Sequence, residues 1–225
     1  MSDDEFAYRE VPTGLPAETA VDIASTLANF LPWIGGPVSN VLGGLSVGRR
    51  LNRVNEVLQG LAEDLRDFKS EASETYVRTE EFEELLENVL RKAAEERNEQ
   101  KRRLLRTFLV EAIERPGPSY DEQRSILRLL DDVEPAHMLV LGALTESPQP
   151  EEMGGMIGSI IGTLQRRLPE WSPQKIEEIV TRMNDLRIIS LASNRMHTMM
   201  TAPGAADLRG AILPIGRRLV SFIKA

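Results

Sequence analysis

Few residues of this chain have the type and spacing that catalysis or metal binding requires. The two histidines, His137 and His197, belong to no HExxH or HxxxH pattern, so no pair of zinc ligands falls on one helix face. With no cysteine present, thiolate nucleophiles, iron–sulfur clusters and disulfides are excluded. Gly35 and Gly36 lack the Lys-Ser/Thr that follows in a phosphate-binding loop. The sequence predicts a protein that is not an enzyme, with no cofactor, no metal and no small-molecule substrate.

Composition favours a helical, acidic protein. Its 225 residues include 35 acidic and 27 basic side chains, and the net charge of −8 gives nucleic-acid binding no long-range electrostatic help. Aromatic residues make up only 5%, which is sparse for a protein rich in strands. The acidic first residues lack the apolar run of a secretory signal. We therefore expect a cytoplasmic, mainly helical protein, with membrane association on activation left open.

An uncharged run from Ile23 to Gly48 is the feature most suggestive of a membrane. It is long enough to cross a bilayer, but prolines and glycines break it near the middle and predict an apolar helical hairpin. Three interpretations stay open: a hairpin in a soluble core, which we favour, conditional membrane insertion, and a permanent anchor. The residues that would act in any of them are Leu31, Trp33, Ile34, Gly35, Gly36, Val41 and Leu42, followed by Arg49 and Arg50.

A helical domain is expected over residues 17–133, after a flexible tail at 1–16. Apolar residues from Leu51 to Phe68 recur at steps of three and four, as in an amphipathic helix. Thr79 and Ser119 have the residue type and neighbours of helix N-caps. The polar tract 94–103 either continues a helix through solvent or forms a hinge. The acidic stretch 61–100 is interpreted as a solvated face, with docking of a basic partner or of the basic C-terminal module as the alternative.

Residues 134–225 have a different pattern. Three helices are expected, from Pro135, over 151–168, and from Pro173 after an N-cap at Ser172. Strand-like pieces at 187–191 and 196–201 then predict a small β-hairpin, and a final helix follows Pro214. Spacing of four in the second helix would stack Gly154, Gly158 and Gly162 for close helix packing.

This order of elements resembles a winged helix. Lys175 to Ile189 looks like the third helix running into the first wing strand, and residues 213–218 (LPIGRR) look like the segment that closes many such domains. More loosely, the whole layout resembles bacterial abortive-infection proteins of the Abi-alpha family. That resemblance implies a role in defence against phage and supplies no catalytic residues.

A partner face is expected on this C-terminal module. Its candidate residues for contacting nucleic acid or protein are Lys175, Arg182, Arg187, Arg195, Arg209, Arg217 and Arg218. Because the third helix also carries Glu177, Glu178 and Asp185, a protein partner or self-association is favoured over DNA. The leading hypothesis is a non-enzymatic interaction or effector protein whose apolar hairpin is sequestered until released. The alternative is a winged-helix transcriptional regulator.

Overall fold

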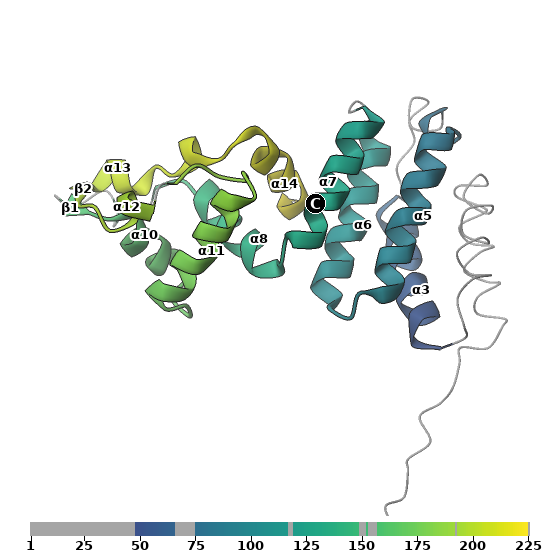
Figure 1. The fold of residues 1–225 in the computed structure, drawn as a ribbon, viewed down its shortest axis with the longest axis horizontal. Coiled ribbons are helices and arrows are strands. Elements are labelled where there is room, and N and C mark those ends of the chain that lie inside the picture. Colours follow the sequence, from purple (N-terminus) through teal and green to yellow (C-terminus); the bar gives the residue numbers. More distant parts are fainter. Residues whose placement is uncertain are drawn as a thin grey trace, which may run out of the picture. The chain divides into compact units, whose positions relative to one another are not determined.

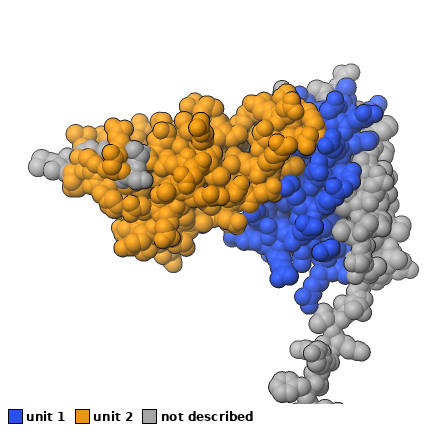
Figure 2. Space-filling view, viewed as in Figure 1, with its two compact units in different colours: residues 1–117 blue, residues 118–225 orange. Residues whose placement is uncertain are grey.

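The computed structural model describes residues 48–65, 75–116, 119–148, 152, 157–191 and 193–224. These residues are mainly helical, as predicted, and Figure 1 shows the order of the elements. The chain divides into two compact units, residues 1–117 and 118–225, which are coloured separately in Figure 2. Helix α7 (Tyr120–Asp132), which the sequence groups with the N-terminal helical domain, clusters with the second unit.

Unit 1 is a bundle in which α3 (Arg49–Asp64) packs on both α5 (Glu80–Glu95) and α6 (Glu99–Glu114). The amphipathic pattern explains the packing, since the apolar stripe of each helix is the buried side. The largest side chains fully buried in this unit are Leu58, Leu61, Phe82, Leu85, Leu86, Leu90, Leu109 and Ile113. The predicted helical bundle is therefore confirmed.

The polar tract 94–103 is where the chain turns from α5 into α6. Helix α5 ends at Glu95, and Asn98 caps α6 by accepting hydrogen bonds from the backbone N–H groups of Gln100 and Lys101. Asn98 is a preferred N-cap residue, because its side-chain oxygen satisfies N–H groups that have no partner within the helix. Of the two interpretations left open by the sequence, the structure shows a break in the helix.

Among the described residues, unit 2 contains the other helices and two short strands. The long helices after α7 are α8 (Pro135–Thr145), α10 (Ile160–Arg167), α11 (Pro173–Asp185) and α14 (Pro214–Lys224). The short elements are α12 (Ser193–Met196), α13 (Ala202–Ala206), the 3-10 helix η1 (Arg209–Ala211), β1 (Ile157–Gly158) and β2 (Met200–Thr201). Helix α8 packs on α11 and α14, and α10 packs on α11. Ser172 caps α11 as predicted, accepting a hydrogen bond from Lys175 N–H.

The structure does not confirm the predicted hairpin between 187–191 and 196–201. Among the described residues, β2 pairs antiparallel with β1, and Ile189 forms a single bridge with Ile212. Asn184 explains part of the difference. Its side chain bonds both backbone groups of Leu191, accepting from the N–H at 2.8 Å and donating to the C=O, so the single N–H of Leu191 is not available to a strand ladder.

The segment 213–218 (LPIGRR), near the end of unit 2, lies close to the backbone of residue 188. Leu213 N–H donates to the Ile188 carbonyl at 3.0 Å, and α14 begins at the next residue. A methyl group at Gly216 would lie 2.3 Å from the same Ile188 oxygen. Glycine is therefore required at this position because the backbone of residue 188 occupies the space of a side chain.

Two predictions concern residues that the structure describes in part or not at all. The apolar hairpin at 23–48 lies outside the described residues except for Gly48, and Gly154 also lies outside them. Gly158 is in β1 and Gly162 in α10, so the expected stack of glycines on one helix is not found in the described part. No helix in the described ranges is both long and apolar enough to cross a membrane.

Candidate functional site

The predicted cationic face of unit 2 is partly neutralised by ion pairs. Arg182 Nη2 lies 2.7 Å from Asp132 Oδ1, and Arg218 Nη2 lies 2.5 Å from Glu122 Oε1. Both acids belong to α7, whereas the arginines belong to α11 and α14. These two cations are therefore paired within the unit and contribute little net charge to a partner.

Two further arginines bind main-chain oxygens of the same unit. Arg209 Nε donates to the Thr145 carbonyl at 3.0 Å, and its guanidinium also bonds Ser147 Oγ. Arg217 Nε donates to the Ile212 carbonyl at 3.1 Å. Because a guanidinium has five N–H donors, each arginine keeps others for solvent or a partner. Their positions are nevertheless set by internal contacts.

Arg187 is placed by the end of α11. It has a φ of 55°, in the left-handed region that usually favours glycine. Its N–H donates to Asn184 O at 2.9 Å, and the next N–H, of Ile188, donates to Met183 O at 3.0 Å. These two bonds make a Schellman C-cap, with Arg187 at the position where glycine is commonest. Arg187 therefore lies in the sharp turn that ends α11, with its side chain exposed.

Lys175 and Arg195 complete the candidate set. Lys175 Nζ lies 4.1 Å from the centroid of the Trp171 ring, in a cation–π contact, and Arg195 is exposed on α12. Nearby, His197 Nε2 lies 3.2 Å from Glu177 Oε2. The structure therefore brings acids, an aromatic ring and cations together on unit 2, in place of a uniformly basic surface.

Apolar side chains are also exposed on unit 2. Helix α8 (PAHMLVLGALT) is apolar on all sides, and its Leu139 is 54% exposed. Met199, immediately before β2, is 64% exposed. They are the only large apolar side chains so exposed among the described residues. The other residues of α8 are buried or half-buried, so Leu139 is a single exposed apolar side chain on this helix.

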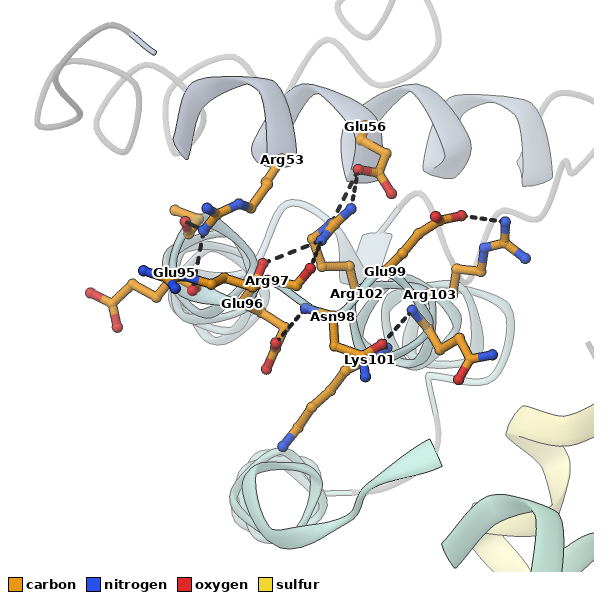
Figure 3. A network of polar contacts seen from close by, with 12 residues as sticks. Arg53, Glu56, Glu95, Glu96, Arg97, Asn98, Glu99, Lys101, Arg102 and Arg103 are labelled. Carbon is orange, nitrogen blue, oxygen red and sulfur yellow. Dashed lines mark hydrogen bonds and ion pairs between the residues drawn. The ribbon is translucent and has the colours of Figure 1, made fainter. Parts of the chain in front are cut away.

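In unit 1 two arginines hold the turn between α5 and α6 (Figure 3). Arg53 of α3 donates to the carbonyls of Ala94 at 2.8 Å and Glu95 at 3.2 Å. Arg102 donates to the carbonyls of Glu96 and Arg97 at 3.3 and 2.9 Å. Helix carbonyls at a C-terminus lack partners within the helix and carry partial negative charge, so guanidinium groups stabilise them.

Arg102 also ties α6 to α3. Its Nη2 lies 2.5 Å from Glu56 Oε2, and its side chain is only 10% exposed (Figure 3). A small pocket of about 140 Å³ lies here, lined by Glu56, Val57, Glu99, Arg102, Arg103 and Arg106. The three arginines are paired with Glu56, Glu99 and Asp64. With its charges already paired, the pocket serves the packing of α3 on α6, and nothing in it resembles a general acid or base.

Unit 2 contains a buried ion pair that the sequence analysis missed. Arg167 Nε and Nη2 donate to the two oxygens of Glu152 at 3.0 and 2.7 Å, and Nη1 donates to the Ala143 carbonyl at 2.7 Å. The side chains of Arg167 and Glu152 are 3% and 4% exposed. A two-bond arginine–carboxylate pair is geometrically specific. The pair therefore fixes residue 152 onto α8 and α10.

Comparison with family models, curated proteins and solved structures gives no match. The site must be interpreted from its own chemistry. In the described parts of the chain, no cluster of three or more His, Cys, Asp or Glu side chains is placed to hold a metal ion.

One further residue missed by the sequence analysis is Asn55 of α3. It is 2% exposed, and neither its Oδ1 nor its Nδ2 has a hydrogen-bond partner. A buried amide without partners is costly and uncommon. The signal in the sequence is the spacing of Leu51, Asn55, Leu58 and Ala62, which runs alongside the stronger apolar stripe through Val54 and Leu61.

Proposed function

We propose that this chain is a non-enzymatic interaction protein with an effector role. In this proposal unit 2 binds a protein partner, and the apolar segment 23–48 is held against the chain until it is released onto a membrane. The observation that carries the proposal is the surface of unit 2, where Arg182 and Arg218 are neutralised by acids while Leu139 is exposed. Such a mixture of apolar and paired charged groups suits a protein surface better than a phosphate backbone.

The order of elements in unit 2 supports a winged-helix-like module. A helix, a short strand and two further helices follow one another as α8, β1, α10 and α11, and α14 ends the unit. Winged helices serve both DNA and protein partners, so the arrangement alone does not choose between them. As in the abortive-infection family that the layout resembles, we place the effector in defence against phage.

The membrane step is tested by leakage of dye from anionic vesicles. Replacing Leu31, Trp33 and Ile34 together by serine should abolish leakage, because the segment 23–48 would lose much of the apolar surface that enters lipid. Replacing the exposed pair Arg182 and Asp132 by serine is the control, and it should leave leakage unchanged. Equal leakage from the triple variant and the parent chain would remove the membrane step from the proposal.

A second candidate function is DNA binding by unit 2. It is favoured by Lys175, Arg187 and Arg195, which are exposed and form no ion pair with an acid among the described residues. If this function is right, Arg195→Glu with Arg217→Glu should abolish binding to duplex DNA, and the parent affinity should fall steeply with salt. We expect no duplex binding by the parent chain at low salt, measured by fluorescence anisotropy. Salt-sensitive binding would favour the regulator instead.

A further inference from the structure

The buried surface of α3 is wider than the single apolar stripe of an amphipathic helix. Val54, Val57 and Leu61 are at most 2% exposed, and they form the stripe expected for an amphipathic helix. Asn55 and Ala62, at 2% and 7%, are buried as well. Helix positions advance by about 100° per residue, so Asn55 points about 160° away from Val57. Two different sides of α3 are therefore covered.

Helices α5 and α6 cover the first of these sides. Arg53 of α3 bonds the last carbonyls of α5, and Glu56 pairs with Arg102 of α6. Arg106 of α6 lies so close over Gly60 that a methyl group there would meet its Nη1 at 2.1 Å. Within the described residues, α5 and α6 are the helices that pack closely on α3. Arg53 and Gly60, through which α3 meets them, point about 160° and 140° away from Asn55.

The second side has the spacing of a coiled-coil seam. Leu51, Asn55, Leu58 and Ala62 follow one another at steps of four, three and four residues. Leu58 is fully buried, and Ala62 is small enough to admit close approach of another backbone. Asparagine at one such position sets the pairing of helices at a cost in stability. We name these four residues the second seam.

We infer that the second seam is the docking site of the apolar segment 23–48 of the same chain, and that Asn55 keeps this docking weak enough to be reversed. The inference rests on the proposed function, for which it supplies the resting position of the segment. Three observations select this occupant. The segment is uncharged along its whole length, it ends where α3 begins, and the junction is Gly48.

Gly48 is suited to reverse the chain. It caps α3 with φ 141° and ψ −149°, a conformation that only glycine adopts readily. Nothing lies within 4 Å of a methyl group placed there, so the backbone angle, and not lack of space, requires glycine. The other segment adjoining α3, residues 66–74, carries five charged side chains among nine and is a poor match for an apolar seam.

Asn55 makes the docked state less stable than an apolar residue at the same position would make it. Its two amide atoms have no partner while the residue is buried. On release of the segment the amide regains hydrogen bonds to water, so the unsatisfied group favours release. Replacing Asn55 by leucine should therefore tighten docking, on the order of tenfold.

The occupant is tested in the full chain by thiol chemistry. Because the chain has no cysteine, Ala62→Cys introduces a unique thiol on the second seam, and Gln59→Cys places one on the exposed side of α3. We expect thiol-specific labelling to be about tenfold or more slower at position 62 than at position 59. A photo-cross-linker attached at position 62 should mark residues 23–48. Equal labelling rates, or cross-links to residues 66–74 or to a second copy, would overturn the inference.

The role of Asn55 is tested by a matched pair of substitutions in the Ala62→Cys background. Asn55→Leu should slow labelling of the thiol at position 62 further and reduce binding to anionic vesicles, whereas Asn52→Leu, on the exposed side, should change neither. Equal effects of the two substitutions would overturn the role of Asn55. If position 62 is protected and cross-links to 23–48, but vesicles never bind, the docking site stands and the proposed membrane function fails.

Discussion

Replacing Arg167 by methionine should destabilise unit 2 by about 3–5 kcal/mol. The substitution leaves the Glu152 carboxylate buried at 4% exposure without the two guanidinium bonds that hold it at 3.0 and 2.7 Å. It also removes the donor to the Ala143 carbonyl. A buried carboxylate that loses its guanidinium partner is costly to a folded protein, and the loss should be visible in urea unfolding followed by circular dichroism.

Two control variants distinguish the effect of burial on stability from the effect of losing a charge alone. Arg182 also forms an ion pair at 2.7 Å, but its side chain and that of Asp132 are 51% and 52% exposed. Arg182→Met should therefore cost less than about 1 kcal/mol. The double variant Glu152→Leu with Arg167→Met should recover most of the lost stability, because both charges are then absent. Similar losses for Arg167→Met and Arg182→Met would contradict the role of the buried pair.

Replacing Gly216 by alanine should cost about 3 kcal/mol, which is large for one methyl group. The new Cβ would lie 2.3 Å from the Ile188 carbonyl oxygen and 2.9 Å from Ile212 Cγ2. Because the nearest atom belongs to the backbone, it cannot move without disturbing the bond from Leu213 N–H to the same oxygen. The start of α14 would then separate from residue 188, and thermal unfolding should report the loss as a lower Tm.

Gly210 provides the control for this substitution. It lies in η1, only a few residues earlier, and no atom lies within 4 Å of a methyl group placed there. Gly210→Ala should change the free energy of unfolding by no more than about 0.5 kcal/mol. A Gly216→Ala variant as stable as Gly210→Ala would show that the LPIGRR segment does not depend on the close approach to Ile188.

Helix starts and apolar stripes were well predicted because both are local. Thr79 caps α5 through a hydrogen bond from Phe82 N–H, Ser119 caps α7, and Pro135 begins α8. Each of these features depends on residues within one turn of helix. The core positions Phe82, Leu85 and Val89 are buried for the same reason, since a period of 3.6 places them on one side.

Features that depend on distant residues were not predicted. The strand-like piece 187–191 lies against residues 211–213 because Asn184 binds the backbone of Leu191, a contact that β propensity does not contain. Of the candidate cations, Arg182 and Arg218 pair with acids of α7, which the sequence assigned to another domain. Counting charges along the sequence identified candidate cations but could not show which of them are already paired.

The measurement that tests the central claim most directly is flotation of the full chain with anionic vesicles at physiological salt. The account predicts that the parent chain floats and that a variant with serine at Leu31, Trp33 and Ile34 does not. It also predicts that Asn55→Leu lowers the floating fraction, whereas Asn52→Leu leaves it unchanged. A parent chain that stays with the soluble fraction, or that floats as well without the three apolar residues, would contradict release of segment 23–48 onto membranes.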